Sequence, residues 1–165
     1  MTPRLASAAA KVRGFTLIEI LVALTLMATL AALALPLTEQ TVRRERETQL
    51  QRALREIRQG IDAYKQAAEA GRIDKSIDDS GYPPSLEALV DGVPDKTDPN
   101  GQRLYFLRRI PRDPTCDCPD LSAAHTWQLR SYGSPADAPS AGKDVFDVLS
   151  KSEGEGLNGI PYRQW

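Results

Sequence analysis

The sequence contains one long apolar run, and this run limits what the chain can fold into. Residues 15–37 carry a single ionisable side chain, that of Glu19. As a helix rising about 1.5 Å per residue, such a segment reaches about 34 Å, enough for a bilayer core of about 30 Å. The remainder of a 165-residue chain is too small to surround this helix on all sides. A membrane helix is therefore the direct prediction, and a buried core helix is disfavoured.

A secretory signal peptide is the competing interpretation of the same run. Basic residues precede it, and Ala32-Leu33-Ala34 has the small-x-small form of a cleavage site. Against this interpretation, the apolar stretch before that site is longer than the usual hydrophobic region of a signal peptide, and it contains Glu19. The basic residues of the leader are Arg4, Lys11 and Arg13.

Glu19 helps to separate these interpretations. An ionisable group inside a membrane segment costs about 3 kcal/mol on insertion scales, so it usually marks a function and has a partner. Neither a plain anchor nor a signal peptide gains anything from such a group. The plainer alternative is that Glu19 lies close enough to one end of the run to reach the headgroup region, where it is tolerated.

The segment KVRGFTLIEILVALTLMATLAALALP, residues 11–36, resembles the class III signal of type IV pilins and type II secretion pseudopilins. That signal has a basic leader ending in glycine, then phenylalanine, a glutamate four residues later, and an apolar run ending near a proline. The resemblance implies that a prepilin peptidase cuts after Gly14 and methylates the new amine of Phe15. It also gives Glu19 a partner, the Phe15 amine of an adjacent subunit, and it makes Glu19 and Pro36 assembly residues.

The same resemblance implies a location and a set of partners. The leader is expected in the cytoplasm, one helix in the inner membrane and the C-terminal domain in the periplasm, although the flanking charges alone leave the orientation close to a tie. The expected partners are identical and related pseudopilin subunits in a homo-oligomeric filament, the prepilin peptidase and the inner-membrane secretion platform. The net charge of −1 suggests no nucleic-acid partner.

Beyond the apolar run, hydrophobic residues recur at alternating spacings of four and three, which predicts an amphipathic helix with one buried face. Gly71 is expected to end this helix. Because only Pro36 interrupts the pattern, a spine helix from Phe15 to Ala70 is predicted, with a kink permitted at Pro36. The charged residues between indicate helix-stabilising pairs, such as Arg43 with Glu47 and Arg52 with Glu56, or contacts between subunits. The stripe consists of Leu50, Leu54, Ile57, Ile61, Tyr64 and Ala68.

In the C-terminal half, the patterns that indicate helices and strands are short and separated by turns. The predicted fold class is α+β. A long N-terminal spine helix is expected to pack against a small antiparallel β-sheet with irregular C-terminal loops. One or two helical turns are predicted over residues 85–90, and strands over residues 126–132 and 144–149. The predicted divisions are a leader (1–14), a transmembrane and assembly helix (15–37), its amphipathic continuation (38–70) and a periplasmic domain (71–165).

Further segments are similar to the major, G-type pseudopilin of type II secretion. They are GYPPSLEALV, LRRIPRDP and the ending DVFDVLSKSEGEGLNGIPYRQW. That resemblance implies a structural subunit of a periplasmic pseudopilus that drives protein secretion across the outer membrane. Where the family continues its Asp-Pro with a tryptophan and a glycine turn, this chain has Thr115-Cys116-Asp117-Cys118. The alternative is a minor type IV pilin, or an inner-membrane-anchored module that binds a surface or DNA.

Cys116 and Cys118 admit three interpretations. A disulfide across one residue needs a tight turn but is feasible in an oxidising compartment. Two inert thiols are nearly as compatible with the sequence. A zinc site with His125 and a nearby aspartate can be drawn, but its spacing fits no common structural pattern.

The last loop combines acidic residues with glycines, which is the composition that a calcium site requires. The G-type resemblance implies calcium bound by the backbone oxygens of Leu149 and Ser152 and by the side chains of Glu153 and Asn158. The family tends to have aspartates at the last two positions. A glycine-rich turn with solvated acids is at least as compatible with these residues.

The sequence favours a protein that is not an enzyme. It has no G-x-x-x-x-G-K-[ST] run, no H-E-x-x-H motif and one histidine, so a nucleophile with its base is hard to assemble.

Overall fold

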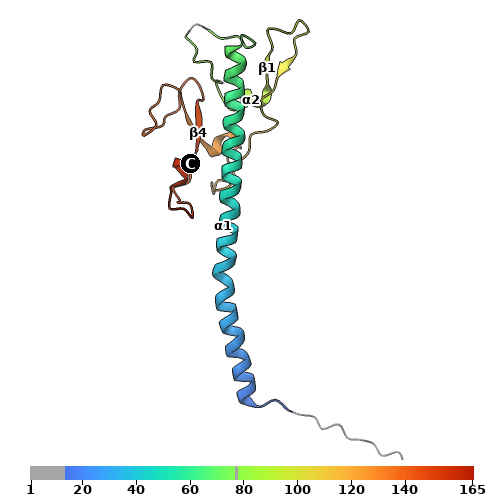
Figure 1. Ribbon diagram of the computed structural model, residues 1–165, viewed down its shortest axis with the longest axis vertical. Coiled ribbons are helices and arrows are strands. Elements are labelled where there is room, and N and C mark those ends of the chain that lie inside the picture. Colours follow the sequence, from blue (N-terminus) through green and yellow to red (C-terminus); the bar gives the residue numbers. More distant parts are fainter. Residues whose placement is uncertain (1–13, 77) are drawn as a thin grey trace, which may run out of the picture. The chain divides into compact units, whose positions relative to one another are not determined.

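The computed structural model describes residues 14–76 and 78–165, with the side chains of residues 33–38 left aside. The predicted leader therefore lies outside the described residues, apart from Gly14. The main element is the helix α1 (Leu17–Glu69). It is the long blue-to-green helix in Figure 1. By their contacts the residues form two compact units, Met1–Thr41 and Val42–Trp165, and α1 contributes to both.

The ends of α1 lie close to the predicted ones, Phe15 and Ala70. Gly71 has a φ of 72°, the left-handed conformation that glycine adopts without strain. Its N–H donates to the carbonyl oxygen of Ala68 at 3.1 Å, and the N–H of Arg72 donates to that of Ala67 at 3.0 Å. These bonds satisfy carbonyls that the helix leaves without partners, as in a glycine C-cap. The helix continues through Pro36, and the predicted kink there falls on residues whose side chains are not described.

The predicted apolar stripe is confirmed as the centre of the core in the unit Val42–Trp165. All six of its residues are buried, with exposed fractions from 0% at Leu50 to 7% at Tyr64. The stripe belongs to one core cluster with buried residues from the C-terminal half, among them Leu86, Trp127 and Val148. This arrangement confirms that the spine helix backs the small β-structure.

The C-terminal half adds short elements, and its two sheets are antiparallel pairs. The helix α2 (Glu87–Asp91) is followed by β1 (Val93–Pro94) and β2 (Arg103–Leu104), which pair with each other. The second pair is β3 (Trp127–Arg130) with β4 (Asp147–Ser150), in the register Trp127 to Ser150. Two 3₁₀ turns, Ala124–Thr126 and Tyr162–Gln164, flank this second pair in the sequence. The structure is thus α+β with small antiparallel sheets, as predicted.

The strand predicted to begin at Asp144 begins instead at Asp147. Asp144 is buried and accepts hydrogen bonds from the Ser80 hydroxyl at 2.5 Å, the Ser131 hydroxyl at 2.7 Å and the Tyr132 N–H at 2.8 Å. These bonds lower the pKa of Asp144, although burial opposes them. This carboxylate holds the chain just before the strand, and although the Phe146 N–H donates to the Arg130 carbonyl at 2.8 Å, the paired strand begins at Asp147. The β1–β2 pair was not predicted, since strands of two residues leave no periodic signal.

Removal of a buried side chain from the stripe should unfold the domain more easily. Ile57 is fully buried, so we expect Ile57→Ala to lower the free energy of unfolding by about 2–5 kcal/mol. Val42→Ala is the matched control, because Val42 lies on the same helix and is 51% exposed. Urea unfolding followed by tryptophan fluorescence measures both. Equal losses in the two variants would contradict the assigned core.

The ion pair between Arg72 and Asp95 predicts an acid-sensitive step in stability. The Arg72 guanidinium, the Thr97 hydroxyl and the Thr97 N–H all donate to the Asp95 carboxylate, and they lower its pKa to about 2. A carboxylate whose folded pKa is depressed stabilises the fold above its unfolded pKa of about 4. We therefore expect this contribution to disappear as the pH falls from about 4 to about 2.

The melting temperature of the native protein and of Asp95→Asn, measured between those pH values, tests this expectation. The native protein should lose more stability on acidification than the variant does, because the variant has no carboxylate to protonate. Parallel curves would show that Asp95 does not contribute to acid sensitivity.

Candidate functional site

The predicted cleavage position lies just before the helix, in residues without regular secondary structure. Gly14, Phe15 and Thr16 precede α1, and Gly14 is exposed with no atom within 4 Å of the place where a Cβ would stand. Phe15 is 78% exposed. A protease needs an accessible backbone outside regular secondary structure, and the bond between Gly14 and Phe15 meets both conditions. The structure is therefore compatible with the predicted processing at this bond, which remains a prediction.

Glu19 lies in the first turn of α1 and its side chain is exposed. Its backbone N–H donates to the Thr16 hydroxyl at 3.3 Å and to the Thr16 carbonyl at 3.1 Å. Thr16 is therefore the N-cap of the helix, in the sequence pattern T-x-x-E that is typical of a capping box. The sequence reasoning missed Thr16, although this pattern could have revealed it. Within the described part of the chain, the Glu19 carboxylate forms no ion pair.

Apart from Glu19, the side chains of residues 17–30 form a largely apolar surface that is open along its whole length. Each of the large apolar residues on it is at least 50% exposed: Leu17, Ile18, Ile20, Leu21, Val22, Leu24, Leu26, Met27 and Leu30. Folded soluble proteins rarely leave a contiguous apolar surface of this size in water. The surface consequently calls for a lipid phase or for helices of other chains to cover it.

The comparisons with known proteins point to the same segment. Residues 9–35 match a family described as the prokaryotic N-terminal methylation motif. No curated protein and no solved structure matched the chain. The matched motif is that of type IV pilin-like proteins, which prepilin peptidase processes and which assemble into filaments. Over residues 9–35 the chain therefore carries the N-terminal motif of this class.

The motif is typical of membrane-anchored pilins. Within the described ranges, however, no helix combines the length and the apolar character needed to cross a membrane. The predicted segment 15–37 includes residues 33–37, whose side chains lie outside the description.

The structure joins Cys116 to Cys118 in a disulfide with a Cα–Cα distance of 5.3 Å. Two hydrogen bonds hold the loop around this disulfide. The Arg112 guanidinium donates to the carbonyl oxygen of Cys118 at 2.7 Å, and the buried Asp113 carboxylate accepts from the Thr115 hydroxyl at 2.6 Å. This arrangement corresponds to the first of the three interpretations of the two cysteines.

The two side chains implied as calcium ligands, those of Glu153 and Asn158, have different surroundings. Glu153 is exposed, and the Asn158 side-chain oxygen accepts the N–H of Ile160 at 3.0 Å. Leu149, whose backbone oxygen is implied as a ligand, lies within β4, and Ser152, implied in the same way, follows that strand. Among the described residues, no three His, Cys, Asp or Glu side chains are grouped as a metal site.

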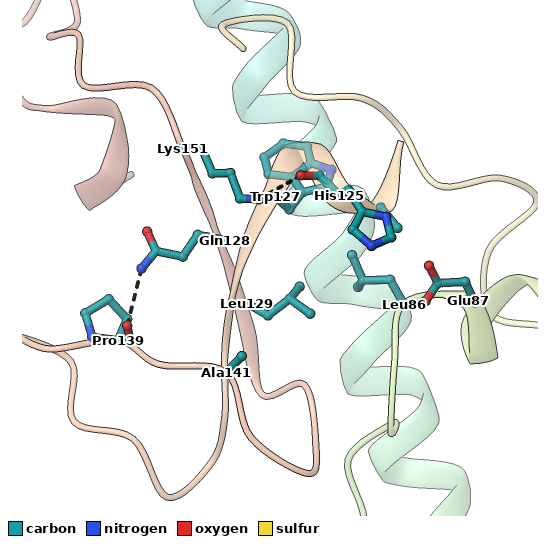
Figure 2. A pocket seen from close by; sticks show the side chains of 10 residues that line it. Leu86, Glu87, His125, Trp127, Gln128, Leu129, Pro139, Ala141 and Lys151 are labelled. Atoms are coloured by element: carbon teal, nitrogen blue, oxygen red, sulfur yellow. Dashed lines mark hydrogen bonds between the residues drawn. The ribbon is translucent and has the colours of Figure 1, made fainter. Parts of the chain in front are cut away.

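A pocket of about 350 Å³ lies beside β3. Figure 2 shows two of its polar side chains turned toward backbone oxygens: the Lys151 amine donates to His125 O at 2.8 Å, and the Gln128 amide to Pro139 O at 3.3 Å. The Nδ1 atom of His125 lies 2.8 Å from the Ser122 hydroxyl. Because these groups already have partners, few polar atoms remain to orient a substrate in the pocket. The structure assigns no chemistry to it.

Proposed function

We propose that this protein is a pseudopilin, a structural subunit of a periplasmic filament that drives type II protein secretion across the outer membrane. The observation that carries the proposal is the order of features at the N-terminus. An exposed bond between Gly14 and Phe15 is followed by Glu19 and by an exposed apolar helical surface. The further similarity of the C-terminal segments to the G-type subunit supports the pseudopilin role over an adhesive one.

Cleavage after Gly14 would create the partner that Glu19 lacks. The peptide N–H of Phe15 carries no charge, whereas the amine formed by cleavage is a cation. In a bundle of apolar helices, that amine and the Glu19 carboxylate of a neighbouring subunit attract strongly because the dielectric is low. Desolvation cancels much of this attraction, so the pair sets the axial register more than it adds affinity. Processing thus converts an unmatched charge into a condition for one stagger between subunits.

The proposal also specifies where the protein is located and which proteins it contacts. Before assembly the chain is stored in the inner membrane with its leader in the cytoplasm and its C-terminal domain in the periplasm. There the prepilin peptidase removes the leader, and the secretion platform adds the subunit to the filament. Pro36, within α1, would allow the helix to adapt to its neighbours as subunits pack. The role is structural, and we propose no catalysis.

A minor pilin or an anchored binding module is the second candidate. The observation that favours it is the loop around the Cys116–Cys118 disulfide, which stands where the G-type family has a tryptophan and a glycine turn. A rigid loop that departs from the family pattern is suited to binding a surface or DNA. Loss of Glu19 separates the two candidates.

The first test replaces Glu19 with alanine. We expect Glu19→Ala to leave processing and protein level unchanged but to abolish secretion and subunit crosslinking, because without this pair no single axial stagger between subunits is selected. Glu39→Ala is the control, since Glu39 is an exposed acid on the same helix. Immunoblots after crosslinking, together with a secretion assay, give the readout. Unchanged crosslinking in Glu19→Ala would overturn the filament proposal, and lost crosslinking with normal secretion would favour the second candidate.

The second test is mass spectrometry of the mature N-terminus. The proposal requires a chain that begins with N-methylated Phe15 in cells that contain prepilin peptidase, and an uncut chain in cells that lack it. A chain that begins at Leu35 in both would mean cleavage by signal peptidase and would exclude a pilin-like assembly segment.

A further inference from the structure

Three charged residues of α1 contact the last part of the chain. They are Arg43, Glu47 and Arg58, and the segment that they contact is residues 147–165, called the strap here. In Figure 1 the strap is the red segment beside α1. The residues lie four and eleven positions apart, close to one and three turns of a helix, so they share one face. This charged face overlaps the edge of the buried apolar stripe.

Arg58 makes the central contact of this face. Its guanidinium donates to Asp147 Oδ1 at 2.8 Å, to the Val148 carbonyl at 3.2 Å and to the Trp165 carbonyl at 2.8 Å. The side chains of Arg58 and Asp147 are only 36% and 22% exposed. One carboxylate and two backbone carbonyls, from the start and the end of the strap, therefore converge on a single cation.

Glu47 and Arg43 hold the middle of the strap. The Glu47 carboxylate accepts the N–H of Leu157 at 2.8 Å and the hydroxyl of Tyr162 at 3.0 Å, and its side chain is 12% exposed. Arg43 donates to the carbonyl oxygen of Glu155 and lies 3.6 Å from Glu47. From successive turns of α1, Glu47 thus accepts from the strap backbone and Arg43 donates to it.

These contacts lie in the region where the G-type resemblance implies a calcium site. Carboxylate and carbonyl oxygens that converge from separate points are what calcium requires. Here such a set exists around Arg58, but guanidinium N–H groups already occupy it. One carboxylate oxygen of Asp147 accepts from Arg58, and the other lies 4.0 Å from Arg130. Asn158 binds within its own turn, and Glu153 is exposed. The oxygens that converge here are therefore held by the Arg58 guanidinium and are not free to bind calcium.

We propose that Arg58, with the pair Arg43 and Glu47, fixes the strap to α1 in place of a divalent cation. The strap then keeps its conformation at any calcium concentration. Its exposed apolar residues Leu157 and Ile160, each 44% exposed, are presented in a fixed position without a metal. This proposal concerns one folded domain, so it stands whether or not the chain builds a secretion filament.

Calcium titration of the full-length protein in detergent is the first test. We expect the melting temperature, followed by tryptophan fluorescence, to stay the same on addition of calcium chloride and on addition of a chelator. A rise with calcium that the chelator reverses would overturn the proposal, because it would show that a cation binds and stabilises the folded state.

Substitution of Arg58 is the second test. Arg58→Gln leaves the Asp147 carboxylate and two carbonyls without their donor, so we expect a fall in melting temperature of at least about 4 °C. The matched control is Arg55→Gln, because the exposed Arg55 donates, within the part of the chain that the structure describes, to the carbonyl of Gln51 in its own helix and to no atom of the strap. Arg58→Gln should also speed trypsin cleavage after Arg163, within the strap, whereas Arg55→Gln should not.

The cleavage rate separates a released strap from a general loss of folding. Faster cleavage at Arg163 while the rest of the domain stays resistant supports the proposal, even if the variant melts at a lower temperature. Equal behaviour of Arg58→Gln and Arg55→Gln in both measurements would show that Arg58 does not hold the strap. As a milder change, Arg58→Lys keeps the charge but loses the planar fork, and it should lie between Arg58→Gln and the native protein in both readouts.

Discussion

The fold depends on the burial of one apolar stripe of α1 against the segments that follow it. The C-terminal half has two antiparallel pairs, one with strands of two residues and one with strands of four. Sheets of this size are not stable alone in water. Leu50 and Ile57, both fully buried, provide the surface on which Trp127 and Val148 pack. Without that stripe, the short strands and turns would have no common core.

The same helix begins with a different kind of surface, and this difference explains why the sequence was so informative at its N-terminus. Residues 17–30 expose their large apolar side chains, and the only charge among them is that of Glu19. Exposing such a surface to water costs free energy, and so does placing the Glu19 carboxylate in lipid. A bundle of processed subunits, as proposed, would reduce both costs at once. The two halves of α1 are therefore adapted to two environments.

Helical periodicity made α1 and its stripe predictable, because each buried residue repeats with the period of the helix. The strands were harder to predict from the sequence. The hydrophobic pattern suggested a strand from Asp144, but the hydrogen bonds of that carboxylate to Ser80 and Ser131 delay its start. The pair of Arg43 with Glu47 was expected from spacing and is confirmed at 3.6 Å. What spacing could not show is that Glu47 also binds Leu157 and Tyr162, more than 100 residues later. Contacts that join distant segments leave no local signal.

The position of Glu19 in the first turn of α1 limits how strongly it can bind a second chain. The N-terminus of a helix carries a partial positive charge, so a carboxylate there is already stabilised by its own helix. The amine that cleavage would create at Phe15 is placed unfavourably for the same reason, since it adds positive charge at the same end. A Glu19 carboxylate from a neighbouring chain relieves that repulsion but gives up part of its interaction with its own helix. The net gain per pair is then small, and the pair contributes mainly by selecting one stagger between chains. In the proposed filament, affinity would come from the apolar side chains that flank it.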